Sequence, residues 1–245
     1  MRRLTLAGLT LYLAGGPDRE GGGDGPLLLL LHGFGAPGTD LVALHRAIVA
    51  PPAVRYAFPA GRLALDDGAA GDMGPRAWWM IDIARLQTAV VSGDALRLAG
   101  ETPEGLAEAR AAVEGLLDAL ERDHAAPRER IVLGGFSQGG MLACDIALRT
   151  ERAPLGLVLL SGAPIAEPEW RALAPRRAGL RVLMSHGRTD PILPFAGGEH
   201  LRDLLREGGL DVEWHAFSGG HGIPDGVVER LGPFLAEVGA LAAPG

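Results

Sequence analysis

The chain has 245 residues, of which 47% are hydrophobic, and its formal net charge is −7. This length fits one large α/β domain or two small ones, and the apolar content allows a sizeable buried core. Because no internal repeat or break in composition divides the chain, we expect a single domain over residues 1–245. The acidic balance argues against nucleic acid as a partner, because phosphate backbones are bound by basic faces. The lone cysteine, Cys144, excludes an internal disulfide and suits a reducing compartment, so we expect a cytoplasmic protein.

The first part of the chain predicts a hairpin followed by a buried strand. Residues 4–7 and 10–14 alternate between apolar and polar, which favours a β-hairpin over a secretory signal. No stretch reaches the ~18 consecutive apolar residues that a membrane span needs. After a polar loop, residues 27–31 are all leucine, as expected for a strand buried on both faces of a parallel sheet.

The next segment is harder to interpret. We expect a helix over 39–50, capped by Thr39 or Asp40 and stopped by the prolines that follow, and then a strand over 54–58. Residues 59–100 are rich in Gly and Pro, which predicts a long excursion over the top of the sheet with short helical pieces.

The second half alternates between helices and strands. Thr102 as the cap, followed by Pro and Glu, predicts the start of a helix that ends before Pro127. Further strands are expected at 131–133, 155–160, 180–185 and 212–217, and further helices at 141–148, 194–207 and 224–238. This alternation predicts a mainly parallel sheet with helices on both faces.

Residues 134–140 read Gly-Gly-Phe-Ser-Gln-Gly-Gly, between a predicted strand and a predicted helix. The spacing Gly135-x-Ser137-x-Gly139 matches the nucleophile elbow, in which a serine stands on a strained turn. Side chains two residues on either side would collide with the neighbouring strand or helix. The alternative is an ordinary Gly-rich turn.

A base and an acid follow in the order Ser, Asp, His. Asp190 lies just past the strand at 180–185, and His221 lies just past the strand at 212–217. The carboxyl ends of parallel strands share one edge of the sheet, so the three side chains should meet there. We expect Ser137 as the nucleophile, His221 as its base and Asp190 as the group that orients the imidazole.

Each of these residues has a competing interpretation. Asp190 could instead cap the helix expected near 194. His186 is a rival base, but it follows its strand too closely to span the site. His215 lies within a strand and is expected to be structural.

The loop after the leucine strand reads His-Gly-Phe-Gly over residues 32–35. With Gly38 it formally matches a dinucleotide fingerprint, but Pro37 interrupts the turn and no acidic residue follows the next strand. The other interpretation is an oxyanion loop, in which the amides of Phe34 and Gln138 bind the developing negative charge. No metal-ligand cluster is evident, so neither a metal nor another cofactor is expected.

Together, these segments and the string His-Gly-x-x-Asp-Pro-Ile-x-Pro at 186–194 resemble the phospholipase/carboxylesterase family over roughly 27–238. Arg76-Ala77-Trp78-Trp79 is similar to the Trp-containing segment of that family. The resemblance implies an α/β-hydrolase fold with a small or absent lid, here with an N-terminal hairpin added. It also implies activity on carboxylic esters or thioesters.

We expect a serine hydrolase that cleaves esters of short to medium acyl chains through an acyl-enzyme. The same chemistry on a thioester or a lysophospholipid, and a ligand-binding protein without turnover, remain alternatives. The partner is expected to be a small-molecule ester or thioester, and the protein a monomer or homodimer. The predicted substrate pocket is formed by Trp78, Trp79, Ile192 and Leu193, with Phe34 beside them.

Overall fold

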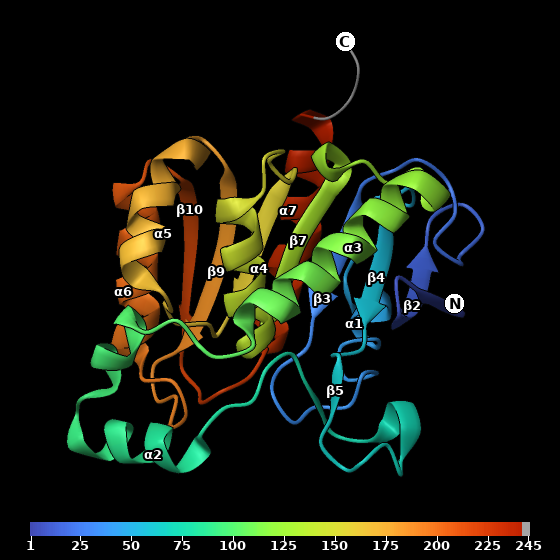
Figure 1. Ribbon diagram of the computed structural model, residues 1–245. Helices are drawn as coiled ribbons and strands as arrows, with labels where there is room; N and C mark the ends of the chain where they lie inside the picture. Colours follow the sequence, from blue (N-terminus) through green and yellow to red (C-terminus); the bar gives the residue numbers. More distant parts are fainter. Residues whose placement is uncertain (242–245) are drawn as a thin grey trace.

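The computed structural model describes residues 1–241 and contains an eight-stranded mixed sheet (Figure 1). The first two neighbouring pairs are antiparallel and all the others are parallel. The N-terminal hairpin and the mainly parallel sheet predicted from the sequence are therefore confirmed. In spatial order the strands are β1 (Arg2–Leu6), β2 (Leu9–Gly15), β4 (Arg55–Pro59), β3 (Leu27–Leu31), β7 (Ile131–Phe136), β8 (Gly156–Leu160), β9 (Arg181–Gly187) and β10 (Asp211–Phe217).

Helices cover both faces of this sheet, as the sequence predicted. One hydrophobic core contains side chains of α3, α4, α5 and α6, and the core on the opposite face contains those of α7. Figure 1 shows α3, α4 and α5 in front of the strands and α7 behind them. The helices are α1 (Leu44–Ala47), α2 (Ile83–Ser92), α3 (Leu106–His124), α4 (Gln138–Arg149), α5 (Glu167–Leu173), α6 (Phe195–Glu207) and α7 (Asp225–Leu241).

The leucine run of β3 supplies both cores. Leu27, Leu29 and Leu31 pack into one core, while Leu28 and Leu30 pack into the other. Successive side chains of a strand point to opposite faces, so an uninterrupted apolar run is required only where both faces are covered. This strand lies between β4 and β7 at the centre of the sheet.

Two predicted helix starts are wrong. The helix expected over 39–50 is reduced to α1, and Thr39 donates to the sulfur of Met73 instead of capping it. α3 begins at Leu106 after Gly105, whose φ of 82° is left-handed, and the hydroxyl of Thr102 donates to the carboxylate of Glu169 instead of capping the helix. In both places, contacts to distant segments replace the expected local cap.

The excursion predicted for residues 59–100 is present. It contains the two-stranded sheet β5 (Leu63–Ala64) and β6 (Arg76–Ala77), the helix α2 and two short 3₁₀ turns. Figure 1 shows α2 and β5 beyond the lower end of the main sheet. No helix within residues 1–241 is long and apolar enough to cross a membrane.

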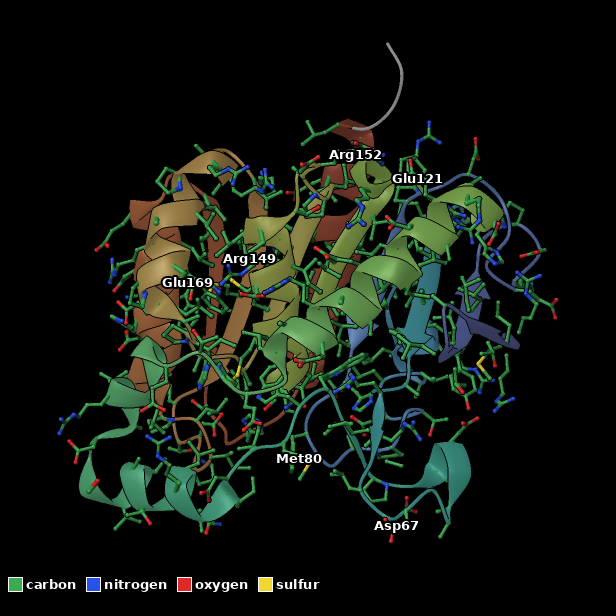
Figure 2. All side chains as sticks on the ribbon, viewed as in Figure 1. Asp67, Met80, Glu121, Arg149, Arg152 and Glu169 are labelled. Carbon is green, nitrogen blue, oxygen red and sulfur yellow. The ribbon has the colours of Figure 1, made fainter. Side chains whose placement is uncertain are left out.

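The helix after the elbow is held by a buried carboxylate. Asp145 of α4 accepts hydrogen bonds from Arg110 at 2.5 Å, from Arg149 at 2.8 Å and from the indole of Trp170 at 2.8 Å. Arg149 also pairs with Glu169, and Figure 2 shows this pair between α4 and α5. The contacts tie α3, α4 and α5 together, which fixes the helix whose first turn faces the site.

The last four residues of the predicted domain, 242–245, lie outside the described residues.

Candidate active site

A cavity of about 610 Å³ opens at the end of the sheet where the parallel strands finish. Each loop that follows a parallel strand contributes to its wall, so residues far apart in the sequence meet there. Figure 2 shows Met80, one of the lining residues, on the side of the molecule where α2 lies. One lining residue from each loop, in chain order, is Phe34, Trp79, Ser137, Ile165, Leu193 and His221.

Ser137 occupies a strained turn between β7 and α4. Its φ of 53° and ψ of −119° lie in a region that non-glycine residues rarely adopt. A Cβ on Gly135 would lie 2.6 Å from the carbonyl oxygen of Leu31, and one on Gly139 would lie 2.7 Å from that of His32. The two glycines are therefore required for the turn to approach β3 so closely, and the turn exposes the serine to the cavity.

His221 and Asp190 are joined by a short hydrogen bond. The imidazole Nδ1 of His221 donates to Asp190 Oδ2 at 2.6 Å, and the carboxylate itself is fully buried. The other oxygen, Oδ1, accepts the backbone amides of Ile192 and Leu193, each at 2.9 Å. Burial raises the pKa of Asp190, but the His221 bond and the two amides outweigh it and hold this pKa below its usual value.

Asp190 does not cap α6, whose N-cap residue is Pro194. Its Oδ1 instead closes a tight turn with the next residues, which leaves Oδ2 for the imidazole. The rival base His186 is fully buried and does not line the cavity. His215 lies in β10, where it pairs with Glu213 at 2.6 Å.

Ser137 and His221 both line the cavity, but no hydrogen bond joins them within the described residues. The ring of Phe136 packs against that of His221 with centroids 4.8 Å apart, which places the imidazole next to the elbow. In enzymes without substrate such a bond is commonly long and shortens only when substrate binds.

Two residues that line the cavity with Ser137 have backbone amides available for hydrogen bonding. Gln138 is the first residue of α4, and Phe34 lies in the loop after β3. Among the described residues neither amide donates a backbone hydrogen bond, and both residues line the cavity. Free amides of this kind can bind an oxyanion.

His32 fixes the loop that carries Phe34. Its Nδ1 donates to the carbonyl of Gly33 at 2.8 Å, and its Nε2 accepts the amide of Gly61 at 2.8 Å. Only a neutral imidazole can make both bonds. Burial lowers the pKa of His32, the bond to the Gly33 carbonyl raises it and the nearby Arg76 lowers it, and the balance of the three brings this pKa to about 4.

The predicted pocket residues separate into two groups. Trp79, Ile192 and Leu193 line the cavity, whereas Trp78 is fully buried outside its wall. The Trp78 indole instead donates to the carbonyl of His32 at 2.9 Å, so this side chain supports the loop and does not contact the cavity. The side chain of Gln138 accepts the amide of Trp78 at 3.0 Å and donates to the carbonyl of Trp79 at 2.8 Å.

The supporting roles of His32 and of the Gln138 side chain are absent from the sequence-based predictions. A histidine at the end of a buried strand and a glutamine in an apolar helix start were the available signals.

A further buried residue, Ser161, follows β8 with a φ of 51° and donates to the carbonyl of Gly222 at 3.3 Å. It therefore supports the loop that carries His221.

Comparisons with known proteins agree with this fold. The chain is 31% identical over 150 residues to acyl-protein thioesterase 1 of Neurospora crassa, a match that covers 60% of each chain. It is 34% identical over 103 residues to acyl-protein thioesterase 1 of Cryptococcus neoformans, which covers 42% of this chain and 43% of that protein. The chain thus matches no more than about 60% of the length of these curated relatives.

Solved structures resemble the chain over nearly its whole length. A carboxylesterase from Mesorhizobium loti has a TM-score of 0.73 at 24% identity, covering 96% of this chain and 98% of that one. The Bacillus cereus carboxylesterase has a TM-score of 0.66 at 22% identity, covering 94% of each chain. These similarities confirm the α/β-hydrolase fold. The sequence pattern described as Phospholipase/Carboxylesterase matches residues 22–238, and the chain therefore belongs to the phospholipase/carboxylesterase family.

Proposed function

We propose that this chain is a serine hydrolase that cleaves carboxylic esters of short to medium acyl chains. The observation that carries the proposal is the strained Ser137 in one cavity with His221, which is bonded to the buried Asp190 at 2.6 Å. An unactivated serine is a poor nucleophile, and a positioned imidazole overcomes this by accepting its proton. The buried carboxylate fixes the tautomer that leaves Nε2 free to do so.

The proposed reaction has two halves. Ser137 Oγ attacks the ester carbonyl while His221 Nε2 takes its proton, and the amides of Phe34 and Gln138 stabilise the negative oxygen. The C–O bond to the leaving alcohol then breaks, and His221 returns the proton to that alcohol. Water attacks the resulting acyl-enzyme with the same proton transfers, which releases the carboxylic acid and restores Ser137.

The acyl group would occupy the apolar part of the cavity. Trp79 and Leu193 are almost completely buried in its wall, while Ile192 is 48% exposed at the rim. Met141, in the first turn of α4, is also nearly buried and adds a flexible apolar surface to the wall. Such a wall would bind an alkyl chain by the hydrophobic effect, without selecting the leaving group.

A thioester is the second candidate substrate. Its support is the name of the curated relatives, which are acyl-protein thioesterases. The proposed oxyanion is the same for an ester and a thioester, so only contacts to the leaving alcohol or thiol can distinguish the two substrates. A lysophospholipid would require a binding site for its headgroup. Cytoplasmic location and a monomeric or dimeric state remain predictions.

Labelling with a fluorophosphonate tests the proposal. We expect wild type to be labelled and Ser137→Ala to be unlabelled, because the probe requires an activated serine. Ser92→Ala is a matched control, since Ser92 lies at the end of α2 outside the cavity wall. Absence of labelling in folded wild type would overturn the proposal and favour a ligand-binding protein without turnover.

A substrate series then compares the leaving groups. p-Nitrophenyl esters of increasing acyl length are assayed beside acyl-CoA thioesters and lysophosphatidylcholine, with kcat/KM determined for each. The proposal predicts the highest kcat/KM on oxygen esters of short to medium chains. A higher kcat/KM on the thioesters or on the lysophospholipid would replace this substrate class with one of the alternatives.

A further inference from the structure

His186 lies directly behind the proposed catalytic acid and has no part in the mechanism above. It is the second-to-last residue of β9, and its side chain is completely buried. Burying an imidazole is unfavourable unless its polar atoms gain partners, so its position calls for a physical account.

One ring nitrogen of His186 faces two acceptors. Nε2 is 2.8 Å from the carbonyl oxygen of Leu193 and 3.4 Å from Asp190 Oδ2. Two acceptors require a hydrogen on Nε2. Nδ1 is buried and makes no hydrogen bond of normal geometry within the described residues, although the backbone of Gly162 lies near the ring, so the hydrogen that the ring donates is the one on Nε2. Burial lowers the pKa of His186, His221 lowers it further, and the Leu193 carbonyl, Asp190 and the Gly162 backbone oppose this only in part.

The bond from His186 completes a clamp around the acid loop. The amide of Leu193 donates to Asp190 Oδ1 at 2.9 Å, while its carbonyl accepts from His186 at 2.8 Å. The backbone N–H and C=O of Leu193 are therefore both hydrogen-bonded. Because the amides of Ile192 and Leu193 fix Oδ1, the same turn decides where Oδ2 points, which is toward His221.

The ring of His186 has little freedom to move. A Cβ on Gly198 of α6 would lie 2.7 Å from its Cγ, so only a glycine permits this approach. The ring of Phe195 meets it edge-on with centroids 6.1 Å apart. Packing from α6 thus holds the donor in the direction of the Leu193 carbonyl.

We propose that His186 is a positioning residue, which as a neutral Nε2–H donor fixes the Leu193 carbonyl and thereby aims the Asp190 carboxylate at His221. The inference deepens the proposed hydrolase function and rests on it. His186 does not touch the substrate in this scheme, so its loss should slow the chemical step and leave substrate binding intact.

The first test compares His186→Phe, which keeps an aromatic ring without the donor, with His186→Gln, whose amide retains one. We expect kcat to fall about 10- to 100-fold in His186→Phe with KM unchanged, by analogy with the loss seen when a residue that orients a metal-binding side chain is removed. His186→Gln should recover part of kcat. Rates are divided by the concentration of active sites titrated with fluorophosphonate, so that a smaller folded fraction does not lower the measured kcat.

A proton spectrum supplies a readout without substrate. The short Asp190–His221 bond should give a far-downfield proton resonance in wild type, which should weaken or move in His186→Phe. A role limited to stability would lower the melting temperature and leave both this resonance and the rate per titrated site unchanged. That result would overturn the inference.

Gly198→Ala is a second perturbation, useful if His186→Phe does not fold. Alanine favours the helix, but its methyl group would displace the ring without altering its chemistry. We expect the same fall in kcat at constant KM, and a wild-type kcat would contradict the proposal. If wild type itself were neither labelled nor active, the proposed function would fail, whereas active wild type with unaffected variants refutes only the role of His186.

Discussion

Replacing Asp190 by Asn separates the two tasks of this side chain. The amide oxygen of Asn can still accept the backbone amides of Ile192 and Leu193, which lie 2.9 Å from Oδ1. Its nitrogen would then face His221 Nδ1, which now donates to Oδ2 at 2.6 Å. Two donors cannot share a bond, so the imidazole must adopt the other tautomer and present Nε2–H to Ser137.

The expected loss follows from that tautomer. A protonated Nε2 cannot accept the serine proton, and kcat should fall about 10⁴-fold, or about 5 kcal/mol of transition-state stabilisation. KM should stay near its wild-type value, because Asp190 does not line the cavity. Asp190→Ala should be equally inactive, but it leaves two amides without an acceptor and should lose about 1–3 kcal/mol of folding free energy for each buried amide.

The assay is hydrolysis of a p-nitrophenyl ester, with stability measured by urea unfolding of the same preparations. The reasoning requires Asp190→Asn to be inactive and to lose less stability than Asp190→Ala, because Asn keeps an acceptor for the two amides. Asp190→Asn activity within tenfold of wild type would show that the carboxylate does not set the imidazole tautomer. Equal stability of Asp190→Asn and Asp190→Ala would show that the two amide bonds contribute little.

Two further predictions concern the loop and the turn around Ser137. The pKa of His32 is about 4, below its ordinary value of 6.5, so below pH 6.5 the unfolded chain gains a proton that the folded chain does not. The free energy of unfolding should therefore be unaffected by His32 above pH 6.5 and should decrease by about 3 kcal/mol as the pH falls to 4. Unfolding of wild type and His32→Gln at both ends of this range should show a smaller pH dependence in the variant, and equal slopes would contradict the assignment. Gly139→Ala should lose about 3 kcal/mol or more, because its Cβ would collide with the carbonyls of Leu31 and His32. Gly226→Ala is the control, because a Cβ there would meet no atom of the described residues within 4 Å apart from its own helix backbone, and equal melting temperatures of the two variants would refute the collision.

The strands could be predicted from the sequence because each is a short apolar run. The run at 27–31 coincides with β3, and the strands expected at 155–160 and 212–217 differ from β8 and β10 by one residue at the start. Helix starts were less accurate. Thr102 has the chemistry of a cap, but its hydroxyl bonds Glu169, and local preference cannot reveal such a distant partner.

Chain order sufficed to select Asp190 and His221 from the acids and histidines of the chain, and the structure brings them within 2.6 Å. Their catalytic roles remain predictions. The supporting side chains could not be inferred, since no spacing shows which carbonyl a buried histidine will meet. Trp78 illustrates the same limit, because two adjacent tryptophans look alike in the sequence while only Trp79 reaches the cavity.

The position of β10 has a consequence for inactivation by heat. This strand forms one edge of the sheet and, within residues 1–241, pairs with β9 alone, yet the loop that follows it carries His221. Ser137 follows β7, which is held between β3 and β8. Edge elements open at lower free energy than central ones, so the imidazole should detach from its partners while the rest of the sheet is still intact. Warming should therefore abolish turnover several degrees before the protein melts.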